Sequence, residues 1–225
     1  GALDNDNVTS NRQPTFRVAF DRNGLEAGDT LQLASGTTVL SSHVLDESDL
    51  AAGRVDLAPG DPLAAGTDPA VNARILDRAG NVGTASPNLV PALVIDFAEP
   101  AAPGVPDLLA DDDSGDSATD NVTRVDASLR FSGILAEAGL SVAVSLDGVA
   151  MDSATVAASS WSFELPGPVL DGAHSLTVVS TDLAGNVSEA ASLAFTVDTT
   201  PPAIAEISTP VPSGNYGTGT SFPIT

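Results

Sequence analysis

The residues best suited to chemistry in this sequence run from Asp111 to Thr123 and read DDDSGDSATDNVT. They include five aspartates and one asparagine in thirteen residues, with no basic residue among them. Carboxylates this close repel one another, and Arg124, which follows, is a single positive charge. A hard divalent cation would neutralise them, and Ca²⁺ suits flexible loops that offer roughly six to eight oxygen ligands. The alternative is a solvated acidic loop that binds nothing.

An internal repeat indicates that these acids occupy defined positions. Three short acidic motifs occur twice in the same order: DNVT at 6–9 and 120–123, D-x-AGNV at 77–82 and 182–187, and an apolar residue followed by aspartate at 95–96 and 197–198. Much of the sequence between these motifs differs. The repeat therefore favours positioned carboxylates over a generally acidic composition.

Short stretches in which apolar and polar residues alternate predict the elements that must hold these motifs. They are Thr15–Phe20, Thr30–Leu33, Val55–Leu57, Val71–Ile75 and Leu93–Ile95, then Ala127–Phe131, Leu140–Leu146, Trp161–Leu165, Leu176–Ser180 and Leu193–Val197. Asp147-Gly148 predicts a hairpin turn, and the one helix candidate, Glu47–Ala52, is short. About seven strands per hundred residues predict an all-β chain of tandem immunoglobulin-like β-sandwiches joined by short proline-rich linkers.

The proline runs and the repeat divide the chain. We expect an Ig-like domain over 1–98 whose first strand is truncated (unit one), a linker over 99–105, and a second Ig-like domain over 106–199 (unit two). Residues 200–225 would be a linker and the first strands of a truncated third domain. The opening residues, Gly1 to Asp4, resemble the cut end of a longer protein.

Composition excludes several classes of function. With 8 arginines, no lysine and 30 acidic residues, the net charge is -22, which disfavours binding to nucleic acid or to an anionic membrane surface. There is no cysteine and no apolar run long enough to cross a membrane. Trp161 alternates with Phe163 and is expected in the core. His43 and His174 lie in different units and are expected to be surface residues rather than a zinc or catalytic pair.

The motifs together resemble a known family. An acidic Asp-Ser-Gly loop, Asp-Asn-x-Thr, the strand around Trp161, Asp-x-Ala-Gly-Asn and the closing Val-Asp-Thr-Thr-Pro-Pro resemble the bacterial Ig-like repeats of giant calcium-dependent surface adhesins exported by type I secretion. Unit two carries nearly the whole pattern. Unit one lacks the opening strand and the Trp, and Phe97-Ala98-Glu99-Pro100 replaces Thr-Thr-Pro-Pro. The resemblance implies a structural repeat, often with Ca²⁺ at the junctions between domains.

Strand order in such a sandwich predicts where the acids meet. The last hairpin loop lies where the chain enters the unit, and the first loop and the end of the last strand lie at the opposite pole. The metal ligands expected on this basis, in unit one, unit two and across the linker, are Asp4, Asp6, Asn7, Asp77, Asn81, Asp96, Asp111, Asp113, Asp116, Asp120, Asn121, Asp182, Asn186 and Asp198.

The sequence thus predicts a stalk repeat of a bacterial cell-surface adhesin that Ca²⁺ makes rigid. It would be secreted, be present at the cell surface or in biofilm, and be a monomer whose partners are neighbouring repeats. Host, cell or biofilm ligands would be contacted through other domains. The alternative is a carbohydrate- or protein-binding module on the same fold, which would need an exposed aromatic platform. No nucleophile or phosphate-binding motif predicts an enzyme.

Overall fold

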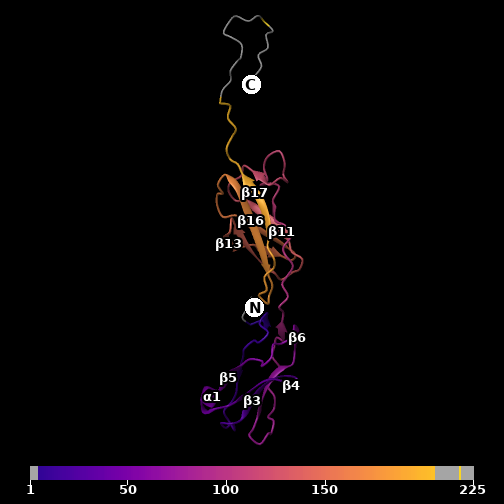
Figure 1. Ribbon diagram of the computed structural model, residues 1–225, viewed down its shortest axis with the longest axis vertical. Helices are drawn as coiled ribbons and strands as arrows, with labels where there is room; N and C mark the ends of the chain where they lie inside the picture. The colour runs from indigo at the N-terminus through magenta and orange to yellow at the C-terminus, as the bar shows by residue number, and fades with distance from the viewer. Residues whose placement is uncertain (1–4, 206–217, 219–225) are drawn as a thin grey trace.

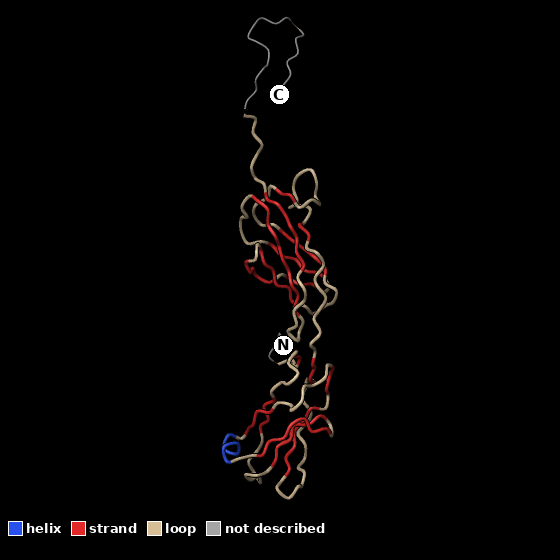
Figure 2. Tube along the Cα trace, viewed as in Figure 1, coloured by secondary structure: helices blue, strands red, loops and turns tan. Residues whose placement is uncertain are grey.

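The computed structural model describes residues 5–205 and 218, and it is nearly all β. The strands form two groups, stacked end to end along the long axis of the molecule (Figures 1 and 2). Each group has its own hydrophobic core, one built around Leu31, Leu33 and Ile95 and the other around Phe131, Trp161 and Phe195. The fold predicted from the sequence, tandem Ig-like sandwiches, is confirmed.

Unit one is built from eight strands and one short helix. The strands are β1 (Val8–Thr9), β2 (Phe16–Ala19), β3 (Thr30–Ser35), β4 (Thr38–Val44), β5 (Arg54–Leu57), β6 (Gly66–Asp68), β7 (Val71–Leu76) and β8 (Leu93–Ile95). They pair as β4-β3-β7, as β2-β5 and as β1-β8-β6, where β1 runs parallel to β8.

The helix α1 (Glu47–Ala52) is short, and it is stabilised by the caps at its two ends. Asp46 caps it, because its side chain accepts the Asp49 N–H while the Asp49 side chain accepts the Asp46 N–H. Gly53 ends it in the left-handed conformation at φ 65°. Leu50 is its buried residue, which fixes the helix to the core of unit one.

Unit two is the more complete sandwich. Its strands are β9 (Asp107–Leu108), β10 (Val122–Thr123), β11 (Arg130–Ile134), β12 (Ser141–Leu146), β13 (Val149–Ser153), β14 (Thr155–Ala157), β15 (Ser160–Glu164), β16 (Gly172–Thr181) and β17 (Ala191–Val197). One sheet has the order β10-β17-β16-β12-β13 and the other β14-β15-β11-β9. As in unit one, the short strand β10 pairs in parallel with the last strand, β17.

The inner faces of the two sheets of unit two enclose its core. Trp161 is 2% exposed and lies over Gly133, its partner on β11, as the alternation around it predicted. The Asp147-Gly148 turn joins β12 to β13 as expected, with both residues at positive φ. The first strands predicted for a third domain fall outside the described residues.

Candidate cation sites at the poles of the units

The predicted acidic residues gather at the ends of the sandwiches. Asp6 and Asn7 precede β1, and Asp96 follows β8. The N-terminal stretch and the chain that leaves β8 both lie at the end of unit one that faces unit two (Figure 1). Asp182 to Asn186 follow β16 and lie at the facing end of unit two (Figure 1). We call this meeting point the junction.

Among the described residues, two hydrogen bonds cross the junction. The Asn186 side-chain amide donates to the Asp96 carbonyl at 2.9 Å. The Ser10 N–H donates to the Ala184 carbonyl at 3.1 Å. Ala184 itself is only 2% exposed, so the tip of the unit-two loop is covered. The Asp182 loop is therefore docked on unit one.

The two copies of the D-x-AGN motif form the same turn in different surroundings. In each, the aspartate carboxylate accepts the asparagine N–H and side-chain amide, at 2.8 and 2.7 Å for Asp77 and at 2.9 and 2.8 Å for Asp182. The hydrogen bonds from Asn81, first the side chain and then the backbone, lower the pKa of Asp77 below its ordinary value. Ala79 is exposed, whereas Ala184 is buried at the junction. The motif thus closes its own hairpin whether or not it meets another domain.

The opposite end of unit two, which we call the far pole, reproduces the unit-one side of the junction. Asn7 and Asn121 both have positive φ, 57° and 59°, and their carbonyls accept an N–H from the last strand at 2.9 and 2.8 Å. Asp6 and Asp120 both accept the N–H two residues onward. Asp198, the counterpart of Asp96, accepts the Thr200 N–H just as Asp96 accepts that of Ala98. The sequence repeat is therefore also a repeat of backbone geometry.

Three side-chain oxygens at these poles are buried without a hydrogen-bond partner. They are Oδ2 of Asp6 and, at the far pole, Oδ1 of Asp113 and of Asn121. Asp113 is 3% exposed, and its other oxygen accepts the Asn121 N–H at 3.1 Å. No ion pair among the described residues includes Asp113. A buried carboxylate oxygen without a donor is costly, because its hydration is lost and nothing replaces it.

One arginine, Arg130, neutralises part of the negative charge of the acidic loop, and the sequence analysis did not identify it. The Arg130 guanidinium donates twice to the Asp112 carboxylate, both at 2.9 Å, and lies 3.7 Å from Asp111. The side-chain hydrogen bond from Arg130 is the main reason why the pKa of Asp112 lies below its ordinary value. Arg124, which directly follows the acidic loop in the sequence, forms none of the ion pairs among the described residues.

The remaining predicted ligands do not come together. Asp111, Asp116 and Asp120 are exposed, and Asp4 lies outside the described residues. Nowhere in residues 5–205 do three or more acidic, histidine or cysteine side chains gather as a metal cluster. The far pole instead offers one buried carboxylate oxygen and one buried amide oxygen. These are hard oxygen donors of the kind that Ca²⁺ takes, so Asp113 and Asn121 fit the cation as part of a ligand set that backbone carbonyls and water would have to complete.

Each of the two histidines lies beside an aspartate of its own unit. His43 lies 2.8 Å from the Asp49 carboxylate and is half-buried. The His174 side chain is 13% exposed and lies between Asp147 and the Leu170 carbonyl. They remain in different units, and no third ligand joins either of them in the described part of the chain.

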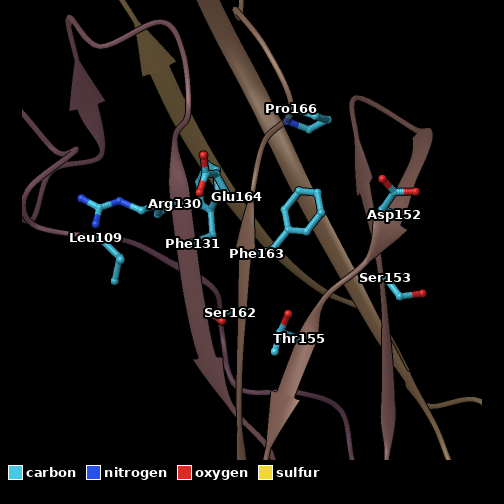
Figure 3. Close-up of a pocket in the computed structure, with 10 residues that line it drawn as sticks. All are labelled: Leu109, Arg130, Phe131, Asp152, Ser153, Thr155, Ser162, Phe163, Glu164 and Pro166. Carbon is cyan, nitrogen blue, oxygen red and sulfur yellow. The ribbon is translucent and has the colours of Figure 1, made fainter.

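A separate hollow lies on the β14-β15-β11-β9 sheet of unit two. Its volume is about 400 Å³, and Figure 3 shows the Phe163 ring between the strand of Arg130 and the hairpin that carries Asp152 and Ser153. The Arg130 guanidinium points away from that ring (Figure 3). The hollow contains none of the predicted metal ligands, and its lining mixes small polar and apolar groups without an exposed aromatic platform.

Fold and site together define a pair of Ig-like β-sandwiches with polar poles. Comparison with known families agrees with this for unit two: residues 99–199 match the family model of the bacterial Ig-like domain. Those residues are therefore similar in sequence to bacterial Ig-like domains. No curated protein sequence matches the chain. Within the described residues, no helix is long and apolar enough to span a membrane.

Several solved structures are similar over most of the chain. The fibronectin(III)-like modules of Clostridium thermocellum CbhA share 14% identity over 84% of this chain and 87% of theirs, with a TM-score of 0.47. The human OSCAR ligand-binding domain shares 14% identity over 84% of this chain and 92% of its own, with a TM-score of 0.32. A Bacteroides ovatus protein, SGBP-B in complex with mixed-linkage heptasaccharide, shares 13% identity over 87% of this chain and 45% of its own, with a TM-score of 0.26.

Proposed function

We propose that this chain is part of the stalk of a bacterial surface adhesin, where Ig-like units act as spacers and Ca²⁺ at their poles fixes the angle between neighbours. The protein would work outside the cell as a monomer whose partners are adjacent repeats. Ligands on host cells or in biofilm would be contacted by other domains. The observation that carries the proposal is the docked loop at the junction.

The two copies of the D-x-AGN turn support a spacer role. Both turns close themselves with the same hydrogen bonds, yet only the unit-two turn is covered by another domain, through the bonds from Asn186 and Ser10. A turn that is complete by itself and also fits the pole of its neighbour suits serial repetition. Because the far pole repeats the backbone of the unit-one side, it offers the same surface to a following domain.

The buried unpartnered oxygens support calcium as the fixing agent. Asp6 has one at the junction, and Asp113 and Asn121 have one each at the far pole. A bound divalent cation would supply the missing partner and offset the negative charge of the loop. The ion would act electrostatically: it would join oxygens from both sides of a junction that otherwise repel.

The expected affinity explains when such a stalk would stiffen. Calcium sites of extracellular modules have dissociation constants of about 10⁻⁴ to 10⁻³ M. These sites would be empty in a cytosol low in calcium and filled outside the cell. Binding free energy would then add to folding stability only after export. The net charge of -22 acts in the same direction, since self-repulsion disfavours compaction before export.

The alternative, a carbohydrate- or protein-binding module, has no specific observation in its favour. The one large aromatic side chain that is prominently exposed in the described residues is Phe97, at 47%, and the Arg12 guanidinium covers its ring at 5.0 Å from the centroid. The fold family is generally non-enzymatic, and the structure supplies no reason to assign catalysis.

The test is small-angle scattering on the whole chain, titrated from EDTA into millimolar Ca²⁺, with thermal melts and calorimetric titration alongside. We expect the maximum dimension to become well defined and the melting temperature to rise with Ca²⁺, and much less with Mg²⁺. If neither quantity responds to Ca²⁺, the acidic loops are solvated turns and the calcium part of the proposal is wrong.

Two variants distinguish calcium binding at the junction from calcium binding at the far pole. Asp6→Asn should abolish the calcium effect on shape, whereas Asp113→Asn should leave the shape response and weaken calcium binding at the far pole on the order of tenfold or more. Asp152→Asn, an exposed change on β13, is the control and should match the parent chain. An Asp6→Asn chain that still stiffens with Ca²⁺ would contradict a junction site.

A further inference from the structure

One carboxylate holds the chain where it leaves unit two. Asp171 lies directly before β16, and its Oδ1 accepts the Thr199 N–H at 3.0 Å and the Thr199 hydroxyl at 2.7 Å. Its Oδ2 accepts the Thr200 hydroxyl at 2.8 Å. The Thr199 hydroxyl, followed by the Thr200 hydroxyl and the Thr199 N–H, lowers the pKa of Asp171 below its ordinary value. We call these three residues the exit clasp.

The aspartate of the exit clasp is itself fixed on both sides. Gly172, the residue after it, lies opposite Val197 in the pairing of β16 with β17. The carbonyl of Leu170, the residue before it, lies 2.8 Å from Nε2 of His174. Asp171 therefore has a defined place at the end of the last two strands, and it can define the place of the residues that bind to it.

Unit one has no exit clasp. The glycine equivalent to Gly172 is Gly66, which lies opposite the end of the last strand in the same way. Ala65 precedes it, and Phe97-Ala98 replaces the two threonines, so none of the side chains can form these bonds. The exit of unit one instead contacts unit two, because the Asn186 side-chain amide donates to the Asp96 carbonyl.

The residues that follow the exit clasp transmit its direction. Thr200 precedes Pro201 and Pro202. A residue before proline is restricted to extended conformations, and each proline fixes its own φ near about −65°. Two successive prolines favour a stiff, extended segment. The course of the chain up to Ala203 therefore depends on how Thr199 and Thr200 are held.

We propose that Asp171 is a positioning residue that sets the direction in which the chain leaves unit two. Backbone bonds hold this segment at its start, from the Asp198 N–H to the Thr123 carbonyl and from the Thr200 N–H to the Asp198 carboxylate. The exit clasp adds side-chain bonds that resist rotation of the segment about that point. The direction is thus set inside unit two, without a cation and without contact from a neighbouring unit. This goes beyond the spacer role proposed above and does not depend on calcium binding.

The test measures the direction of the exit in the whole chain. The sequence has no cysteine, so spin labels can be attached at Ala143→Cys, on the exposed face of β12, and at Ala203→Cys. The distance distribution between the labels is recorded in EDTA. Asp171→Ala, which reproduces Ala65 of unit one, should broaden this distribution about twofold. The melting temperature should change by less than about 3 °C, because the exit clasp is exposed to solvent.

Matched changes in the threonines test the hydroxyl bonds without touching the aspartate. Valine at both Thr199 and Thr200 keeps the shape, removes the hydroxyls and should broaden the distribution. Serine at both positions keeps the hydroxyls and should match the parent chain. A second pair of labels within unit two, at Ala143 and Ser159, should give the same distances in every variant.

Two results would overturn the proposal. One is a distribution for Asp171→Ala that is as narrow as that of the parent chain. The other is equal width in the valine and serine variants. Because all distances are recorded in EDTA, neither result bears on the calcium sites, and a chain whose shape ignores Ca²⁺ would leave the role of Asp171 intact.

Discussion

His174 makes a hydrogen bond with each of its ring nitrogens. Nδ1 lies 2.7 Å from the Asp147 carboxylate and Nε2 lies 2.8 Å from the Leu170 carbonyl. A neutral imidazole has one N–H, so both bonds are satisfied only by the protonated ring. Burial pushes the pKa of His174 down, but these two bonds and the Asp147 charge outweigh it, and the pKa lies above its ordinary value.

This residue predicts a pH dependence of stability. A pKa raised in the folded state contributes stability below the unfolded value, about 6.5, and that contribution is lost as pH rises through the folded value. The melting temperature of unit two should therefore fall as pH rises from about 6 to 8.5. The His174→Gln variant should show a flatter profile over the same range. Parallel profiles for the two proteins would show that His174 does not titrate in this way.

The acidic loop illustrates which parts of a site can be predicted from residue types. Its aspartates and their repetition indicate a crowded carboxylate site, and the structure places Asp113 and Asn121 side by side at the far pole. The sequence does not reveal that Asp112 is neutralised by Arg130, because the pairing spans 18 residues and depends on β11. Nor does it separate Asp113, buried with one free oxygen, from Asp111 and Asp116, which are exposed.

At the scale of elements, the packing of β11 against β15 requires a residue without a side chain at Gly133. A Cβ added to Gly133 would lie 2.6 Å from Nε1 of Trp161 and 2.7 Å from its Cε2. Gly133 has no positive φ, so its role is to make room for the indole rather than to turn the chain. The bare backbone of β11 thus allows the largest side chain of unit two to lie flat in the core.

Gly133→Ala should therefore destabilise unit two by overpacking. We expect a loss of about 1–3 kcal/mol in the free energy of unfolding, measured by urea denaturation with Trp161 fluorescence as the probe. Gly60→Ala is the control, because its added Cβ would meet only the Leu40 carbonyl, at an ordinary 3.6 Å. A Gly133→Ala chain as stable as the control would mean that the indole repacks without cost.

The alternation of apolar and polar residues predicted the strands that have one buried face. It did not predict strands that lack a buried face. β8 and β12 agree with prediction to within one residue. The edge strands β4 and β13 were missed, because most of their residues are exposed or half-buried on both faces. The strand predicted at Ala127–Phe131 begins three residues later, at Arg130, because Ser128 adopts φ 57°, although Leu129 is still fully buried.

At the scale of the whole molecule, two direct hydrogen bonds join the two units within the described part of the chain. Asn186 reaches Asp96, and Ser10 reaches Ala184. Strand order predicted that these segments would face one another, since the last hairpin loop and the end of the last strand lie at opposite poles. The sequence does not predict that Ala184 is buried against unit one, because Ala79 occupies the same position of the same motif and is exposed.

Removing the Asn186 side chain should loosen the junction. Asn186→Ala loses the bond to Asp96 as well as the bond to Asp182, whereas Asn81→Ala loses only the equivalent bond to Asp77. Each variant should cost its own unit about 0.5–1.5 kcal/mol. Only Asn186→Ala should broaden the distribution of distances between spin labels placed on the two units. Equal broadening in both variants would contradict a role for Asn186 across the junction.

The parallel pairing of β1 with β8 and of β10 with β17 has a mechanical consequence. In each unit the hydrogen bonds of this pair include those from Val94 to Asn7 and Asp96 to Thr9 in one, and from Thr196 to Asn121 and Asp198 to Thr123 in the other. A pull along the molecule drags the short strand, β1 or β10, past the last strand of its unit, so the bonds of the pair bear the load together instead of opening in turn. Flow or traction on such a chain would meet its resistance at the same strands whose ends carry the acidic poles.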